Sequence, residues 1–520
     1  MSSHLIYSVS RTFLRQAFFS LLVFMALPPL AHAVRVVKVS ETVIDDSEED
    51  FPRRIYSYAI DTDSTGNIHL LYSKPAPPPD SNRCEIVYAT GPSPTNLVKT
   101  VLETNGSIAS ISAGILVNKS NDVVHVCYHS ETPAHLVHQT IVAGIPSEQE
   151  QVDVGGWHSK MQLGPDGSAF FVRESVNSLR LFIPSPTSPT WTGVNFAPSG
   201  SHAYRIADFA YDRDRNRLHV TYGDNASELK GSPLHNLHYA VSDDGVDWEE
   251  SVVDSSTSLW EAEFWTSLVL DLGGNPVVST YQYAEYNGTY NTGTALLLAR
   301  RSGTNWSSRR IVGYIPGQTP PDHRAGMGGQ LHVDEAGVLL GAWDNSPDRP
   351  IDFDGQYGNI AMNFSVEGSD WISTNQFQVE PFSAEGYCRL ASHRTNLYML
   401  ALGNFSDAKL YLIQLDIRRQ WWWQATDMGN SWRWTSWFGF FTTFADPWIF
   451  HYEALGWMYA PGFSPTSLWF WTADLGWLWT RDTTYPYFWS KERDSWLWYN
   501  GSASPRWFVD MTTGEWLSFP

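Results

Sequence analysis

Polar and titratable side chains recur just after a series of short apolar strands. Histidine, arginine, tyrosine and carboxylate groups can exchange protons, bind anions or hydrogen-bond to the hydroxyls of a sugar. If the loops after these strands emerge on one face, the groups converge into a binding or catalytic site. The alternative is that the loops are polar simply because they meet water. The candidate residues are His129, Arg173, Glu174, Asp224, Tyr281, Tyr283, Tyr286, Asp344 and Arg349.

The elements that must position these residues follow a seven-fold pattern of a turn, a strand, a gap and a second strand. The first strands end at intervals of 44 to 62 residues. Such a period indicates repeat units that cannot bury their apolar faces alone. We therefore expect an all-β fold, a seven-bladed β-propeller over residues 34–416, because a closed ring leaves few exposed edges. The strand ends are Tyr72, Tyr128, Val172, Tyr222, Tyr281, Trp343 and Ala401.

A closed ring has two consequences for single residues. Loops that leave equivalent strands lie on one face, around the mouth of the central channel. His69, His125 and His219 occupy one position of the repeat, so we interpret them as parts of the scaffold.

Residues 34–50 form an acidic, polar lead-in, which is either a solvated arm or an outer strand that closes the ring.

One turn resembles the Asp-box (BNR) turn of sialidase-like propellers. In 241–248, Val-Ser-Asp-Asp-Gly-Val-Asp-Trp, a glycine allows the left-handed backbone, an aspartate caps the turn amides and a tryptophan enters the core. The resemblance implies a propeller. It does not imply sialidase activity, because the Arg-Ile-Pro signature of sialidases is reduced to the scrambled 52–55, Pro-Arg-Arg-Ile.

A second stretch is similar to a strand and loop of ulvan-lyase-type propellers. It consists of 124–129, Val-His-Val-Cys-Tyr-His, followed by 133–136, Pro-Ala-His-Leu. This resemblance implies β-elimination of a uronate polysaccharide, which requires a base, an acid and a cation that neutralises the carboxylate. His129 would be the base or the neighbour of the uronate, Arg173 the neutralising cation, and Tyr281 or Tyr283 the acid.

The N-terminus has the features of a secretory signal peptide over residues 1–33. Arg11 and Arg15 precede an apolar run over 17–30, and 31–33, Ala-His-Ala, has the form of a cleavage site. An uncleaved membrane anchor is the alternative. We expect a secreted or cell-surface protein with no membrane span after signal cleavage.

Charge and cysteine usage restrict the ligands. The net charge of −21 argues against nucleic acid, whose phosphates require a basic surface, and fits a neutral or modestly charged glycan. No motif for a metal or another cofactor is found.

The chain has 3 cysteines, and Cys84 and Cys388 would meet if the ring joined its two ends, which makes a disulfide between them a hypothesis.

The composition changes after residue 416. Of the 25 tryptophans, 17 lie between Trp421 and Trp516. The segment 455–459, Leu-Gly-Trp-Met-Tyr, recurs as 475–479 and nearly as 494–498, which predicts short hairpins with a period of about 20 residues. The pattern looks like the aromatic-hairpin repeats at the C-termini of exported bacterial proteins. The rings either stabilise small hairpins or form platforms for sugars or cages for a quaternary ammonium.

Together these features predict an exported propeller that engages a carbohydrate, followed by a module, 417–520, that binds a glycan or a component of the cell envelope. A polysaccharide lyase and a sialidase-type glycosidase are the enzymatic alternatives. A non-catalytic propeller that binds a glycan or a protein at the cell surface is the other.

Overall fold

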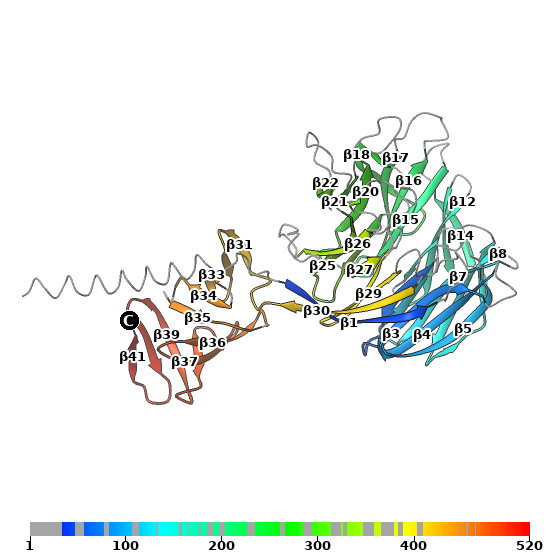
Figure 1. Ribbon diagram of the computed structural model, residues 1–520. Coiled ribbons are helices and arrows are strands. Elements are labelled where there is room, and N and C mark those ends of the chain that lie inside the picture. Colours follow the sequence, from blue (N-terminus) through cyan, green and yellow to red (C-terminus); the bar gives the residue numbers. More distant parts are fainter. Residues whose placement is uncertain are drawn as a thin grey trace, which may run out of the picture. The chain divides into compact units, whose positions relative to one another are not determined.

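A computed structural model describes most of the chain after residue 33, and every regular element within the described residues is a β-strand. The chain divides into one compact unit over Val36–Asp416 and another that contains Ile417–Pro520 (Figure 1). The predicted signal peptide lies outside the described residues. The described ranges are 34–46, 57–76, 83–106, 114–131, 134–154, 159–164, 166–175, 178–184, 191–196, 203–225, 235–259, 266–283, 294–313, 324–325, 330–346, 358–365, 379–382, 388–402, 409–445, 447–453, 456–462 and 464–519.

The described strands of the first unit form six antiparallel sheets. The largest has nine strands, namely β2 (Tyr58–Thr62), β3 (Ile68–Pro75), β4 (Cys84–Ser93), β5 (Asn96–Gly106), β6 (Gly114–Asn118), β7 (Val123–Glu131), β8 (Ala134–Val142), β9 (Ile145–Pro146) and β10 (Glu150–Val154).

Three sheets have four consecutive strands each and run in sequence order. They are β11 (Ser159–Leu163), β12 (Ala169–Ser175), β13 (Ser178–Pro184) and β14 (Trp191–Phe196); β15 (Ala203–Asp212), β16 (Arg217–Asn225), β17 (His235–Ser242) and β18 (Glu249–Leu259); and β19 (Ser267–Leu270), β20 (Pro276–Tyr283), β21 (Thr294–Ser302) and β22 (Asn305–Gly313). A five-stranded sheet follows, made of β23 (Arg324–Ala325), β24 (Gln330–Val333), β25 (Leu339–Ser346), β26 (Gly358–Ser365) and β27 (Val379–Phe382).

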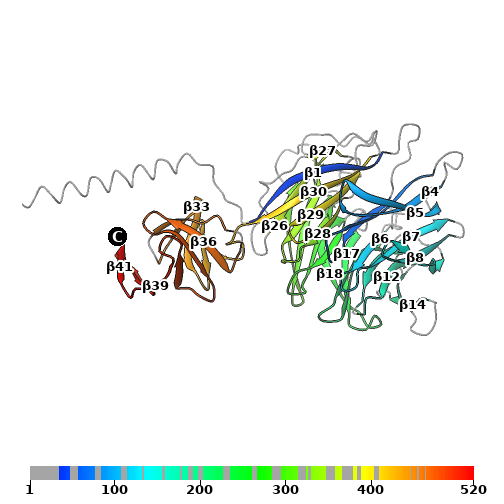
Figure 2. The same cartoon turned by 90° about the horizontal axis from the view of Figure 1, so that it is seen from below.

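The last sheet joins the two ends of the unit. Its order is β1 (Val34–Asp46), β30 (Lys409–Arg419), β29 (Asn396–Leu402) and β28 (Arg389–His393), so the first strand of the chain is its outermost strand (Figure 2). The acidic lead-in is therefore, up to Asp46, the closing strand and not a solvated arm. A side-chain contact also holds β1 in place, since the Tyr72 hydroxyl on β3 donates a hydrogen bond to the Asp45 carboxylate at 2.9 Å.

The innermost strands complete a circle. Each of them contacts the next in the order β2, β6, β11, β15, β19, β24, β28, and β28 contacts β2 again. Apolar clusters fill the spaces between neighbouring groups of strands. A ring of twisted antiparallel sheets that pack face to face is a β-propeller. The predicted fold class is thus confirmed at this level.

The number of sheets differs from the prediction. Six sheets are formed and seven were expected, because β5 pairs with β7 through Gly106 and Ser130, which merges strands β2–β5 with β6–β10 into one sheet. The seven predicted strand ends all lie in strands, on β3, β7, β12, β16, β20, β25 and β29.

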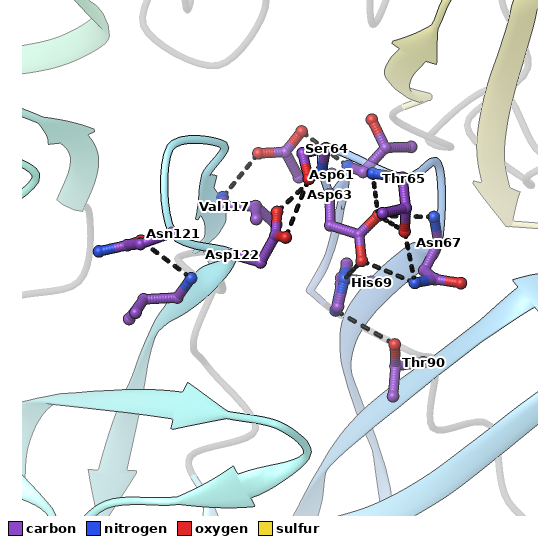
Figure 3. A network of polar contacts seen from close by, with 12 residues as sticks. Asp61, Asp63, Ser64, Thr65, Asn67, His69, Thr90, Val117, Asn121 and Asp122 are labelled. Carbon is purple, nitrogen blue, oxygen red and sulfur yellow. Dashed lines mark hydrogen bonds and ion pairs between the residues drawn. The ribbon is translucent and has the colours of Figure 1, made fainter.

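The turn that precedes β3 shows how a short sequence motif ends one strand of the propeller and begins the next (Figure 3). The Asp63 carboxylate accepts hydrogen bonds from the amides of Thr65 and Asn67, and Gly66 takes φ +91°. These bonds hold the pKa of Asp63 down at about 2 although partial burial opposes the shift. Asp334 caps the equivalent turn before β25 in the same way.

The repeated histidines belong to the scaffold, as predicted. His69, His125 and His219 are buried, and each Nδ1 faces a ring on the next strand: the Tyr88 hydroxyl at 2.7 Å, His138 Nε2 at 3.1 Å and the Tyr239 hydroxyl at 2.6 Å. Burial lowers the pKa of all three, to about 4 for His125 and His219.

The disulfide hypothesis is wrong. Cys84 and Cys388 are buried thiols that are not bonded to each other. The Cys388 Sγ instead faces the Ala342 carbonyl oxygen at 3.8 Å, on a different sheet from Cys84. Cys127 is also buried, which raises the pKa of its thiol to about 12. The closing of the ring therefore depends on strand pairing and packing.

The second unit is a single antiparallel sheet of 11 strands in sequence order. Its core consists mainly of Phe and Leu side chains with two tryptophans, Trp421 and Trp422. The strands are β31 (Thr426–Gly429), β32 (Trp432–Thr435), β33 (Gly439–Ala445), β34 (Trp448–His451), β35 (Gly456–Tyr459), β36 (Ser467–Thr472), β37 (Gly476–Arg481), β38 (Tyr487–Ser490), β39 (Ser495–Ala503), β40 (Arg506–Asp510) and β41 (Trp516–Phe519).

No helix within the described ranges has the length and apolar character needed to cross a membrane.

Candidate functional site

The predicted site residues lie where the second strand of each group ends. His129 is on β7, Arg173 and Glu174 are on β12, and Asp224 is on β16. Tyr281 and Tyr283 are on β20, and Asp344 is on β25. Tyr286 and Arg349 lie outside the described residues. The side chains of His129 and Arg173 are described, and they make the part of the predicted site that can be examined in detail.

His129 and Arg173 point into the same interface from opposite sides. On β7, Cys127 packs toward strands β11–β13, and His129 lies two residues further along the same face. On β12, Phe171 packs into that interface, and Arg173 follows two residues later. The interface therefore receives a histidine from one group of strands and an arginine from the next.

The Arg173 guanidinium is paired with a carboxylate inside this interface. It donates from Nη1 to Asp153 Oδ2, and Arg180 Nη1 lies 3.9 Å from the same oxygen. Asp153 is in register with Leu136, which is in register with His129, so these residues lie at one level across β10, β8 and β7. Sequence reasoning did not include Asp153, although it is the nearest partner of a predicted site residue.

Both predicted residues are largely shielded from water. His129 is 6% exposed and Arg173 is 8% exposed. A buried guanidinium needs a counter-ion, because its transfer from water is costly, and Asp153 supplies one. The arrangement holds a histidine and a neutralised arginine near the ends of strands from two neighbouring sheets. It can orient a ligand group that approaches these ends, and it presents little uncompensated positive charge.

A second polar group lies in the same interface. The His138 Nδ1 is 3.0 Å from the Glu150 carboxylate, and its Nε2 faces His125. The Phe171 and Trp191 rings meet His138 edge-on at 5.6 and 5.4 Å. Desolvation and the neighbouring His138 lower the pKa of His125 to about 4, so His125 resists protonation at neutral pH. Its partners are all internal, which indicates a structural role.

Polar side chains also link the inner strands to one another. The Asp61 carboxylate accepts from the Val117 amide at 2.8 Å (Figure 3), and the Asp208 carboxylate accepts from the Leu268 amide at 2.7 Å. Each bond joins an inner strand to the next one in the circle. Burial raises the pKa of Asp61 despite these bonds. The signal in the sequence is a carboxylate within an otherwise apolar strand.

The remaining links complete most of the circle. Gln162 Nε2 donates to the Phe209 carbonyl at 2.7 Å, and the Leu331 amide donates to Ser267 Oγ at 3.1 Å. His332 Nε2 lies 2.7 Å from Ser392 Oγ, and Thr62 Oγ1 donates to the Ser392 carbonyl at 2.9 Å. These side chains satisfy polar groups of a neighbouring inner strand, so we assign them to the scaffold.

The pattern S/T-x-D-x-G-x-x-W places the hydroxyl position of the Asp-box at Val241 and its carboxylate at Asp243. The turn in the structure uses the residues one position later. Asp244 Oδ1 accepts from the amides of Val246 and Asp247, while Ser242 Oγ accepts from the Gly245 amide. Asp243 points elsewhere and pairs with Arg217. The hydroxyl and carboxylate roles thus fall on Ser242 and Asp244. The assignment to the Asp-box family stays a prediction.

Within the described residues, no three His, Cys, Asp or Glu side chains gather closely enough to hold a metal ion.

Comparison with known proteins gives likenesses of fold alone. No protein-family model matches the sequence, and no curated protein matches it. Solved structures that are similar include a protein of unknown function from Dyadobacter fermentans, with 12% identity, a TM-score of 0.43, and coverage of 74% of this chain and 99% of that one. An α-L-arabinanase from Penicillium chrysogenum, complexed with arabinobiose, has 10% identity, a TM-score of 0.41, and coverage of 73% and 98%. An ulvan lyase has 9% identity, a TM-score of 0.44, and coverage of 75% and 96%.

Proposed function

We propose that this chain is an exported protein whose propeller engages a polysaccharide at the face where the second strands end. The observation that carries the proposal is the convergence of His129 and Arg173 on one interface from adjacent groups of strands. In this proposal residues 1–33 are a signal peptide that is removed, 34–416 form the propeller, and 417–520 attach the protein to a glycan or to the cell envelope.

The propeller is proposed to have seven blades. Strands β2–β5 and β6–β10 pack face to face through the cluster that contains Leu71, Tyr88 and Tyr128, as the other neighbouring groups do. A single residue pair, Gly106 and Ser130, joins them into one sheet. Counting them as two blades gives the seven inner strands of the circle. We also propose that the second unit consists of hairpin repeats with a period near twenty residues.

The catalytic form of the proposal is β-elimination of a uronate polysaccharide. His129 would remove the proton next to the carboxylate, Tyr281 or Tyr283 would protonate the leaving oxygen, and Arg173 would stabilise the charge on the carboxylate. Glu174, Asp224, Tyr286, Asp344 and Arg349 would contact the sugar chain. No cofactor is required for this chemistry.

Non-catalytic glycan binding is the second candidate, and one observation favours it. Arg173 is already paired with Asp153, whereas β-elimination needs a cation that is open to the uronate. A propeller with this site would bind a sugar chain through hydrogen bonds without cleaving it.

The two candidates are separated by incubating the protein with alginate, pectate, glucuronan and ulvan and following the absorbance of unsaturated uronate. A lyase gives a rising signal that His129→Gln reduces by about 10²- to 10⁴-fold, the usual contribution of a general base. His69→Gln serves as the matched control, because that histidine is internal. Binding to one of these polymers without any absorbance change would leave the non-catalytic function and exclude the lyase.

A further inference from the structure

The outward face of the second unit is built from aromatic side chains. Along β36 the side chains of Leu468 and Phe470 are buried, while Trp469 and Trp471 point outward. The same alternation continues through strands β34–β41. We define the aromatic face as the outward residues Trp448, Phe450, Trp457, Tyr459, Trp469, Trp471, Trp477, Trp479, Tyr487, Trp489, Trp496, Trp498, Trp507 and Trp516.

Strand register arranges these rings in rows that cross the sheet. Trp448 is opposite Tyr459, which is opposite Trp471, which is opposite Trp477. A second row contains Trp469, Trp479, Trp489 and Trp496 in the same manner. The ring centroids of Trp469 and Trp479 are 6.5 Å apart, and the Trp496 centroid lies 5.8 Å from that of Trp479 and 5.7 Å from that of Trp489. The result is a continuous aromatic surface with a regular step, which suits a polymer better than a compact ligand.

The rings of the aromatic face remain accessible. Trp457, Trp469 and Trp516 are 39%, 43% and 55% exposed. In the described part of the chain, the indole N–H groups of Trp469 and Trp516 have no hydrogen bond to protein, so they remain available to an acceptor. Indole offers an apolar ring face together with a donor at its edge, the two features that match the C–H face and the hydroxyls of a pyranose.

Charge decides among the polymers that aromatic platforms can bind. A single-stranded nucleic acid also stacks on rings, but it requires a positively charged groove, and an anionic membrane surface requires a cluster of basic residues. Arg481 is the one charged outward residue among the described positions of β34–β41. Residues 417–520 contain seven basic and nine acidic residues, a net charge of −2, against −21 for the whole chain. The face is thus complementary to an uncharged polymer.

We propose that the aromatic face is a binding site for a neutral, unbranched polysaccharide whose sugar rings stack along the rows. This site deepens the attachment part of the proposed function, and it is separate from the propeller site. Binding depends on ring stacking and not on ion pairing, so its affinity is independent of salt.

Affinity electrophoresis of the full chain tests this proposal. The gels contain hydroxyethyl cellulose, mixed-linkage β-glucan or linear arabinan, with alginate as the charged polymer. We expect retardation by at least one neutral polymer, equal at 50 and 500 mM NaCl. The triple variant Trp457→Ala, Trp469→Ala, Trp516→Ala is expected to lose at least tenfold in affinity. Met511→Ala, an exposed apolar residue of a turn in the same sheet, is the matched control and is expected to bind normally.

Replacing the same three tryptophans by tyrosine keeps aromatic rings at these positions, and we expect an affinity within fivefold of the parent chain. This variant provides a test of the rings that does not depend on the folding of the alanine variant. The triple alanine variant is expected to keep any uronate binding or cleavage that the parent chain shows, so a failure of the propeller site is recognised separately. The proposal is overturned by no retardation in any neutral polymer, by retardation in alginate alone, or by equal binding of the alanine variant. Two further outcomes would overturn it, both with unchanged binding of the alanine variant to neutral polymers. In one, the variant no longer pellets with phosphatidylglycerol vesicles although the parent chain does. In the other, the parent chain self-associates and the variant does not.

Discussion

At the scale of single residues, two polar side chains in the interface between β6–β10 and β11–β14 each have a carboxylate partner within the protein. Arg173 lies beside Asp153, and Glu150 lies beside His138. In each case the partner is on another strand, and for Arg173 it is on another sheet. A predicted catalytic cation is therefore also a structural one. Its contribution to stability must be measured separately from its contribution to any reaction.

The Arg173–Asp153 pair gives the first stability prediction. Asp153→Asn and Arg173→Met are each expected to lower the free energy of unfolding by about 3 to 5 kcal/mol, because each leaves one buried charge without its partner. The double variant Arg173→Met, Asp153→Leu is expected to cost less than the two single losses combined. Urea unfolding followed by near-ultraviolet circular dichroism measures these values.

The exposed pair Arg217–Asp243 is the control for this comparison, since its side chains are 45% and 66% exposed. Asp243→Asn is expected to change stability by less than about 1 kcal/mol. Equal effects of Asp153→Asn and Asp243→Asn would contradict a special role for the buried pair.

At the scale of elements, neighbouring inner strands are joined by side chains that accept backbone N–H groups. Asp61 and Asp208 do this with carboxylates, and Ser267 does it with a hydroxyl. An inner strand lies at the centre of the ring, and its outward neighbours already use its other backbone groups. A side-chain acceptor therefore replaces a partner that the sheet does not supply.

Asp61 tests this function of the inner strands. Asp61→Asn keeps an acceptor oxygen for the Val117 amide and is expected to change the unfolding free energy by less than about 1 kcal/mol. Asp61→Ala leaves that buried amide without an acceptor and is expected to cost about 1 to 3 kcal/mol. Thermal unfolding of the two variants distinguishes them. If alanine were tolerated as well as asparagine, the link would be incidental.

At the scale of the whole molecule, buried neutral histidines make the fold sensitive to acid. Desolvation lowers the pKa of His125, His219 and His332 in the propeller, and of His451 in the second unit, to about 4. The ordinary histidine pKa is 6.5. Between these values the unfolded chain binds more protons than the native one, so stability is complete above about 6.5 and falls as the pH decreases toward 4.

We expect the urea midpoint of the propeller to fall steadily between pH 7 and pH 4.5. His219→Gln keeps a polar partner for the Tyr239 hydroxyl and removes one titrating group. The slope of the unfolding free energy against pH is therefore expected to decrease by the equivalent of up to one proton. Asp63, with a pKa of about 2, adds its own loss only below about 3.8. A midpoint that does not change over this range, or a variant with the same slope as the parent chain, would contradict this account.

Much of the fold was predictable because it depends on local patterns. Runs such as Ile68–Tyr72 and Val124–Tyr128 carry apolar side chains on both faces, and turns such as 63–67 carry an aspartate and a glycine. Burial between two neighbouring groups of strands produces the first pattern, and the left-handed backbone of a tight turn produces the second. The alternation of tryptophan with leucine or phenylalanine after residue 447 likewise predicts a one-sided aromatic sheet.

The site was less predictable because its contacts join segments that are remote in sequence. The sequence by itself determined an all-β chain with strands at the predicted ends, scaffold histidines and a neutral, tryptophan-rich C-terminal part. Only the tertiary structure decided that Arg173 meets Asp153, that Asp61 reaches the Val117 amide, and that β1 closes the ring on β30. Local periodicity records which side chains are buried, whereas the partner of a buried charge depends on register and on how the sheets close into a ring.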